Sequence, residues 1–166
     1  MDGTLACIQL SDAQNYRPNL SARALGKTYP LSYVDTGVPH AVCLVRRLAD
    51  IDVRTVGQAL RFHSLWGPQG ANINFVERVS ATRLKVRTYE RGVEGETLAC
   101  GTGVAACGIV MGLRGLVQTP VHCQVHGGDV LEVNFLAHPQ TPKHPASAVT
   151  LKGPVRLTYE GEIALS

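Results

Sequence analysis

The chain has 166 residues, of which 45% are apolar, 17% charged and only 5% aromatic, and its formal net charge is +3. This length suits one domain with its own core, and the low charged fraction excludes a charge-driven disordered chain and a coiled coil. No apolar run approaches the roughly 20 residues that a membrane-spanning helix needs. The acidic N-terminus lacks the profile of a secretory signal, so we expect a cytoplasmic protein with no membrane partner.

The first 63 residues predict strands followed by one amphipathic helix. Asp52 can cap a helix over 53–63, where Val56 and Leu60 recur with helical period. The apolar and β-branched segments before it predict strands at 3–10, 31–40 and 41–48, and 11–30 is expected to be a long loop or an edge hairpin.

The central segment predicts an antiparallel hairpin. Residues 72–79 and 83–90 alternate apolar and polar side chains on either side of a short turn, and 91–97 form a glycine-rich acidic loop. The densest basic cluster lies here, with three of its four residues on one strand face: Arg83, Lys85, Arg87 and, beyond them, Arg91. No nucleic-acid-binding motif accompanies the cluster, so it indicates a solvated strand face rather than a nucleic-acid partner.

The last third combines a buried helix with further strands. Residues 104–116 are almost free of polar groups, which is typical of a helix that is covered on every side. Strands are expected at 121–125, 129–136 and 147–163, with a turn at 126–129 and a loop at 138–146. We therefore predict an α+β fold over 1–166 as a single domain, in which a mostly antiparallel β-barrel or half-barrel wraps around a central buried helix.

Five cysteines are scattered along the chain without the paired spacings of a disulfide framework. Cys100 stands apart because Gly101, Thr102 and Gly103 follow it at the start of the apolar helix. Unpaired backbone N–H groups at a helix N-terminus bind anions such as a carboxylate. The same field favours a thiolate, so Cys100 is expected to have a lowered pKa.

Three known sequence motifs overlap the segment around Cys100, but each lacks residues that the motif requires. A dinucleotide-binding pattern lacks its strand and its acidic residue, the lysine of a phosphate-binding P-loop is absent, and Ala106 replaces a phosphatase arginine. The sequence thus contains no cofactor motif. Two interpretations stay open: Cys100 acts as nucleophile or base with His40 as partner, or both are structural residues. His122 and His126 are interpreted as surface histidines, and no metal site is expected.

Three ordered motifs resemble the diaminopimelate epimerase family, in its C-terminal domain. The segment 89–103 (YERGVEGETLACGTG) is similar to the family's active-site signature. The segments 34–42 (VDTGVPHAV) and 70–76 (GANINFV) resemble its Gly-x-Pro-His and Asn-x-Asn-Phe segments, and 152–163 resembles its C-terminal end. The match is strongest over 31–163, with 1–30 as a strand and connecting loop.

The resemblance implies a two-domain, cofactor-independent amino-acid epimerase that needs no pyridoxal phosphate. Such an enzyme converts LL- to meso-diaminopimelate, for lysine and cell-wall precursors, with two cysteines as acid and base. Each of its two domains is a β-structure around a central helix. The roles it implies here are catalytic for Cys100, Glu90 and His40, α-carboxylate binding for Gly101 and Thr102, and recognition of the distal end for Asn72, Glu90 and Arg91.

The sequence departs from the family in three ways. No segment resembles the N-terminal Cys-Gly-Asn-Gly that carries the second thiol, and Cys7 is expected to be an ordinary strand residue. Val38 replaces an asparagine, and Glu94 lengthens the acidic loop without expected harm.

These departures predict that the chain lacks the N-terminal domain. It would then be inactive alone and need a separate N-terminal domain or a homo-oligomer. The alternatives are a catalytically incompetent remnant that binds a ligand or a protein, and a related isomerase with another small-molecule substrate.

Overall fold

The computed structural model describes residues 4–163. In these residues the apolar and alternating segments form strands, and the amphipathic segment 53–63 and the uniformly apolar segment 104–116 contribute the two α-helices, with two short 3-10 turns, η1 (Leu48–Asp50) and η2 (Ser64–Trp66). The elements are β1 (Leu5–Gln9), β2 (Gln14–Ala24), β3 (Lys27–Asp35), β4 (Pro39–Val45), α1 (Val53–Arg61), β5 (Asn72–Arg78), β6 (Arg83–Glu90), β7 (Gly95–Thr97), α2 (Gly101–Leu113), β8 (Val121–Gln124), β9 (Val130–Ala137) and β10 (Ala146–Pro154).

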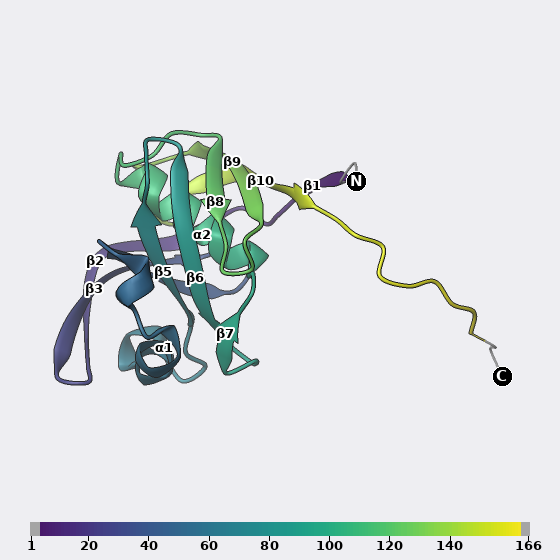
Figure 1. Ribbon diagram of the computed structural model, residues 1–166. Coiled ribbons are helices and arrows are strands. Elements are labelled where there is room, and N and C mark those ends of the chain that lie inside the picture. The colour runs from purple at the N-terminus through teal and green to yellow at the C-terminus, as the bar shows by residue number, and fades with distance from the viewer. Residues whose placement is uncertain (1–3, 164–166) are drawn as a thin grey trace.

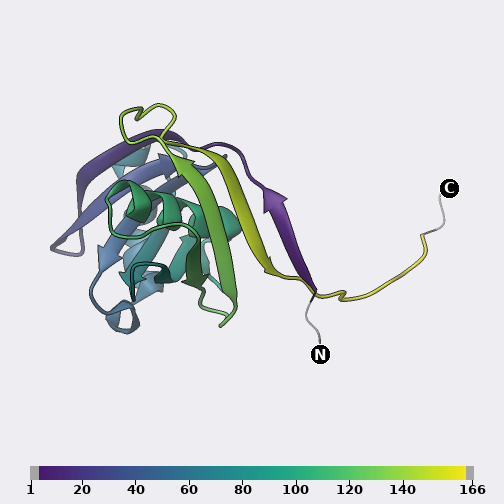
Figure 2. The same ribbon diagram turned by 90° about the horizontal axis from the view of Figure 1, so that it is seen from above.

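A single curled sheet wraps around α2 (Figures 1 and 2). The strand order is β1-β10-β9-β8-β6-β5-β4-β3-β2, and β7 pairs with β6 beside this path. The β4–β5 and β6–β8 pairs are parallel and the others antiparallel. The sheet is not closed, so the half-barrel form of the predicted architecture is confirmed.

One continuous segment forms both edges of this sheet. β1 is one edge strand and pairs with β10. The chain then crosses to the other edge, where β2 pairs with β3. Between them, the Leu10 N–H donates to the Val149 carbonyl at 2.9 Å, and Ala13 bridges to Ala146. Residues 11–30 therefore form the edge hairpin, not the loop, of the two predicted alternatives.

The core around α2 explains why this helix carries almost no polar side chain. Residues 103–111 are all buried, and Ile109, Val110 and Met111 have no exposed surface. Gly108 and Gly112 let the helix approach Val133 and Phe135 on β9. The helix begins at Gly101, three residues before the predicted start, so the Gly-Thr-Gly segment forms its first turn.

A second hydrophobic cluster lies under α1, which packs against β5 and β6. The predicted Asp52 cap is confirmed, because its Oδ1 accepts the Thr55 N–H at 3.0 Å. Leu60, Phe75 and Tyr89 are buried in this cluster. α1 ends at Arg61 rather than at residue 63.

The predicted strand over 147–163 is wrong beyond Pro154. The Val155 N–H donates to the Thr4 carbonyl at 2.9 Å, after which residues 156–163 extend away from the body without forming a strand or helix (Figure 1). Leu157 and Tyr159 alternate as in a strand but are exposed. The side chains of this segment alternate as in a strand, but no neighbouring strand pairs with its backbone. None of the helices in residues 4–163 is long and apolar enough to cross a membrane.

Candidate active site

Cys100 occupies the residue that precedes the first turn of α2. Its backbone is extended, with φ −132° and ψ 105°, and the residue is 8% exposed. Its carbonyl accepts the Val104 N–H at 2.9 Å, which leaves the N–H groups of Gly101, Thr102 and Gly103 without a partner inside the helix. This end of α2 therefore offers backbone donors and a thiol at the same place.

A buried polar network connects this helix end to the sheet. His40 on β4 is fully buried, and its Nε2 lies 3.0 Å from the Thr102 hydroxyl. Its Nδ1 lies 3.1 Å from the side-chain nitrogen of Asn74 on β5. The hydroxyl of Thr88 on β6 donates to Asn74 Oδ1 at 2.9 Å. Three strands thus hold the first turn of α2 through His40.

The donors and acceptors of this network define the protonation state of His40. Asn74 Nδ2 also donates to the Ala41 carbonyl at 3.1 Å, so the nitrogen of this amide faces His40 Nδ1 and donates to it. Nε2 then carries the proton and donates to Thr102. Burial lowers the pKa of His40 to about 3. A neutral imidazole whose free lone pair is occupied is a poor acceptor for a proton from Cys100, which argues against His40 as the general base for this thiol.

Thr102 connects His40 with the thiol. Because its oxygen accepts from His40, its O–H is available for Cys100 Sγ, 3.7 Å away. The backbone carbonyl of Thr102 accepts from Thr36 at 3.1 Å, which anchors the same turn to the β3–β4 connection.

The expectation of a lowered Cys100 pKa is wrong. Burial raises the pKa of this thiol, and the Glu90 carboxylate adds to the rise. The Thr102 hydroxyl and the Gly103 N–H oppose the shift without reversing it. The motif correctly indicates donors that stabilise a thiolate. However, removing the thiolate charge from water costs more than these two hydrogen bonds return. Cys100 is therefore a thiol at neutral pH.

Gly103→Ala tests how tightly this network is packed. A methyl group at this position would overlap Asn74 Oδ1 and lie 3.2 Å from Cys100 Sγ. We expect a loss of about 1–3 kcal/mol in the free energy of unfolding, measured by urea denaturation. The matched control is Gly108→Ala in the same helix, where the methyl group would meet Val133 at 3.4 Å and the higher helix propensity of alanine opposes any cost of this contact, so stability should change by less than about 1 kcal/mol. Equal effects of the two variants would contradict the packing argument.

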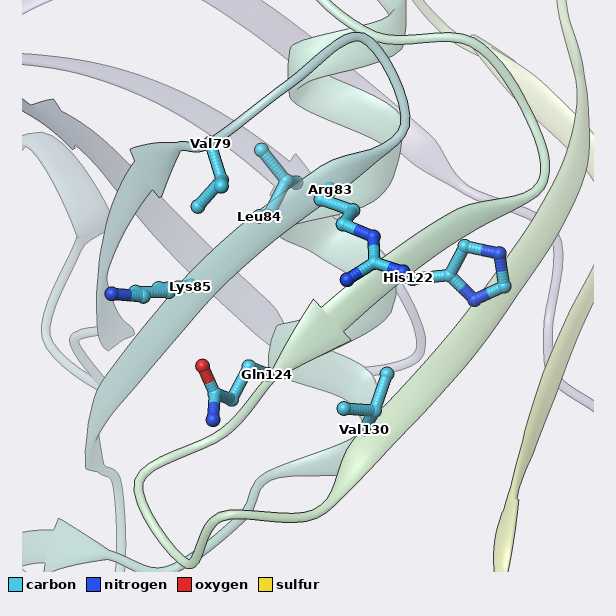
Figure 3. A pocket seen from close by; sticks show the side chains of 7 residues that line it. All are labelled: Val79, Arg83, Leu84, Lys85, His122, Gln124 and Val130. Carbon is cyan, nitrogen blue, oxygen red and sulfur yellow. The ribbon is translucent and has the colours of Figure 1, made fainter.

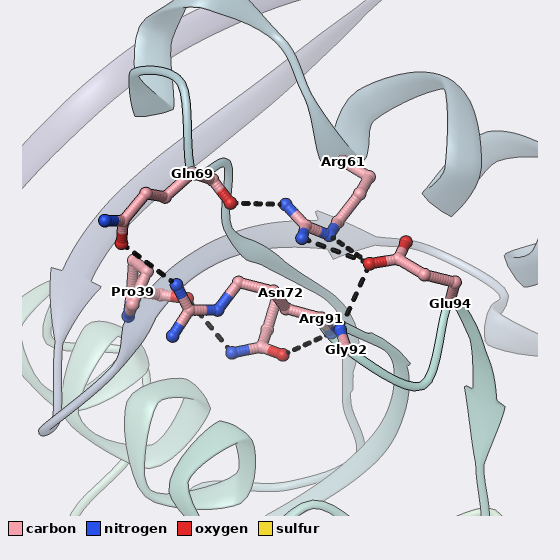
Figure 4. A network of polar contacts seen from close by, with 7 residues as sticks. All are labelled: Pro39, Arg61, Gln69, Asn72, Arg91, Gly92 and Glu94. Atoms are coloured by element: carbon pink, nitrogen blue, oxygen red, sulfur yellow. Dashed lines mark hydrogen bonds and ion pairs between the residues drawn. The ribbon is translucent and has the colours of Figure 1, made fainter.

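The residues expected to recognise a distal group lie beside this network. Asn72 Oδ1 accepts the Arg91 N–H at 2.7 Å, and its Nδ2 donates to the Pro39 carbonyl at 3.2 Å. The Arg91 Nη1 donates to Gln69 Oε1 at 3.5 Å (Figure 4). Glu90 ends β6, is half-buried and lies close enough to affect the pKa of Cys100. The structure thus brings the sequence-predicted site residues to one end of the sheet.

Sequence reasoning missed several residues that hold this site. Asn74 had a usable signal, since it lies two residues after Asn72 in an apolar strand and therefore on the same face. Thr36, Thr88 and Arg61 are single polar residues whose partners are distant in sequence, and no local pattern identifies them.

The basic strand face lies elsewhere, on the outer side of β6 and β8. Arg83 and Lys85 are exposed beside His122 and Gln124 in the parallel register, and the four side chains border a cavity of about 280 Å³ (Figure 3). Arg87 is different, because it forms an ion pair with Glu96, with Nε and Oε1 2.6 Å apart. The solvated face predicted from the alternation is confirmed for Arg83 and Lys85.

His122 lies on β8, which ends at Gln124. His126 lies in the following turn, with its Nδ1 3.5 Å from Glu96 Oε1. Within residues 4–163, no three His, Cys, Asp or Glu side chains cluster as metal ligands.

Known structures share this fold. A probable proline racemase from Agrobacterium radiobacter K84 matches with a TM-score of 0.73 over 98% of this chain and 54% of its own, at 16% identity. A hydroxyproline epimerase from Agrobacterium vitis, solved with trans-4-hydroxy-L-proline, matches with a TM-score of 0.67 over 90% of this chain and 49% of its own, at 16% identity. At these identities the likeness concerns the fold.

Sequence relatives point to one family. The diaminopimelate epimerase of Aquifex aeolicus is 44% identical over 80% of this chain and 45% of its own length. That of a Hydrogenobaculum species is 37% identical over 99% of this chain and 57% of its own. The chain spans about half the length of the curated relatives it matches. The family model described as diaminopimelate epimerase matches residues 32–158, which include His40, Asn74 and Cys100. The chain belongs to the diaminopimelate epimerase family.

Proposed function

We propose that this chain contributes one half of the active site of a diaminopimelate epimerase, with Cys100 as one of two acid–base thiols. The observation that carries this proposal is the position of Cys100 Sγ, 3.7 Å from the Thr102 hydroxyl at a helix end with unpaired N–H groups. The N–H groups of Gly101 and Thr102 suit the α-carboxylate, whose negative charge grows when the α-proton leaves.

The protonation state of Cys100 defines its role in one direction of the reaction. As a thiol at neutral pH, it is the acid. A second cysteine, on a complementary domain, removes the α-proton as a thiolate, and Cys100 returns a proton to the opposite face of the carbanion. The reaction exchanges one thiolate for another, so charge is conserved. The Thr102 O–H and the Gly103 N–H then stabilise the Cys100 thiolate.

The remaining residues divide into support and recognition. His40 donates to Thr102 and thereby leaves its hydroxyl proton for the sulfur. Arg91 is suited to a distal carboxylate, because its guanidinium can form a bidentate pair. Glu90, next to it, is suited to a distal ammonium group.

Exchange of the α-proton of diaminopimelate in deuterated water tests this function. We expect little exchange with the chain alone and clear exchange after addition of a separately expressed N-terminal domain from a relative. If the mixture shows no exchange and the chain does not bind diaminopimelate, the proposal is wrong, and the binding-domain alternative is favoured. Binding without exchange would also contradict the acid–base role of Cys100.

A further inference from the structure

A buried arginine lies beside the site and has no assigned role. Arg61 is the last residue of α1, and its side chain is only 5% exposed. Its Nε and Nη2 both lie 3.1 Å from Glu94 Oε1, and its Nη1 donates to the Gln69 carbonyl at 2.8 Å (Figure 4). A buried guanidinium is costly unless it is paired, so these contacts require an explanation.

The two partners of Arg61 lie in different loops. Gln69 belongs to the loop between η2 and β5, and Glu94 to the turn between β6 and β7. Glu94 Oε1 also accepts the Gly92 N–H at 3.1 Å, and the Glu94 N–H donates to the Glu90 carbonyl at 2.9 Å. One guanidinium therefore ties both loops to the end of α1. Glu94, expected to be a harmless insertion, is half of this connection.

Gly70 shows independently that this close approach is built into the sequence. A methyl group at this position would overlap the Arg61 guanidinium and its backbone carbonyl, and the residue has φ +65°. Only glycine lets the loop come this close in this conformation.

Both loops converge on Arg91. Arg91 lies in the turn between β6 and β7, and its N–H donates to Asn72. The loop between η2 and β5 supplies Gln69, whose Oε1 accepts a hydrogen bond from Arg91 Nη1. We propose that the Arg61–Glu94 pair is a positioning device that holds Arg91 and Glu90 in place for the distal end of an amino-acid substrate. This inference rests on the proposed function for the identity of that substrate. Arg61 and Glu94 themselves act through these neighbours, away from Cys100.

The test compares three variants with one control. Glu94→Ala removes both oxygens, Glu94→Gln retains one acceptor, and Arg61→Lys retains the charge but cannot reach both loops with a single ammonium group. The control is Asp50→Asn, which breaks the exposed Arg47–Asp50 ion pair. All four are full chains.

The first measurement is amide hydrogen exchange of the folded chain by NMR. We expect the Arg91 amide, which donates to Asn72 and not to Glu94, to exchange about tenfold faster in Glu94→Ala, less so in Glu94→Gln, and within about twofold of wild type in Asp50→Asn. The amides of α2 should not change in any variant. This separates loosening of the loops from a general loss of stability.

The second measurement compares diaminopimelate with alanine, which has no distal end. In the mixture with the N-terminal domain, Glu94→Ala and Arg61→Lys should raise KM for diaminopimelate about tenfold, with kcat within about threefold of wild type. Alanine binding should not change. A merely structural role would instead reduce the amount of folded enzyme and so lower kcat.

Each outcome is decisive. If Glu94→Ala leaves exchange at Arg91 within about twofold of wild type, the pair does not hold the turn and the inference is wrong. Looser loops with unchanged KM would contradict the positioning role. If the wild-type mixture neither binds nor turns over diaminopimelate, the proposed function fails and the amide exchange alone decides whether Arg61 holds the loops. If Arg61→Lys does not fold, the two Glu94 variants still decide the question.

Discussion

Replacing Cys100 with serine should lower α-proton exchange of diaminopimelate by about 10³-fold in the mixture with the N-terminal domain. Serine has nearly the same shape, so the fold and the backbone donors of α2 remain. Its hydroxyl is a far weaker acid than a thiol and cannot exchange a proton with the carbanion at neutral pH. Exchange in deuterated water, followed by mass spectrometry, measures the loss.

Cys7→Ser is the matched control for this substitution. Cys7 is exposed on β1 and faces Lys152 across the β1–β10 pair, and it makes no contact with the polar network around Cys100. Its replacement should leave exchange within about twofold of wild type, since it has no part in the proton transfer. Retention of most activity by Cys100→Ser, or equal losses for the two variants, would rule out Cys100 as an acid–base residue.

Stability should fall steeply on the acid side because of His40. Burial lowers the pKa of this imidazole from 6.5 to about 3, so between these values the unfolded chain binds a proton that the folded chain does not. Stability is therefore present above pH 6.5 and is lost as the pH falls, by about 1.4 kcal/mol per pH unit and roughly 5 kcal/mol in all. Urea denaturation at a series of pH values measures this slope.

His40→Asn should flatten the slope, although its stability at neutral pH will be lower because the hydrogen bond to Thr102 is lost or weakened. His144→Gln is the control, since His144 is exposed and the slope should persist. Asp52 and Glu94 have lowered pKa values and add to the slope only near and below the carboxylate range, so the comparison is made above pH 4.5. An unchanged slope in His40→Asn would show that the imidazole is not kept neutral by the fold.

Local patterns predicted those parts of the fold whose structure depends on neighbours in sequence. The uniform apolarity of 104–116 indicated a covered helix, and the alternation in 72–79 and 83–90 indicated the β5–β6 hairpin, which the register Val76–Val86 confirms. The same alternation over 155–163 misled, because a strand also needs a partner and the sheet offers none there. Pattern describes what a segment can form, and packing decides whether it does.

The site was predictable as a set of residues but not as a network. His40, Asn74 and Thr102 are brought together by the parallel β4–β5 register and by the entry of α2 into the curled sheet, neither of which is visible in the local sequence. The predicted direction of the Cys100 pKa shift was wrong for a related reason. A helix N-terminus can be recognised from Cys-Gly-Thr-Gly, whereas the burial that raises the pKa depends on the surrounding strands.

The burial of residues 103–111 has a consequence for the proposed binding of a carboxylate at the N-terminus of α2. Because the body of the helix is packed on every side, the N–H groups of its partly exposed first turn are held in a fixed orientation, and little ordering entropy would be lost when a carboxylate binds there. Adaptation to different substrates must then come from the loops that carry Gln69 and Arg91. Within such a scaffold, new substrate preferences would arise by changing the loops, while the proton-transfer end remained the same.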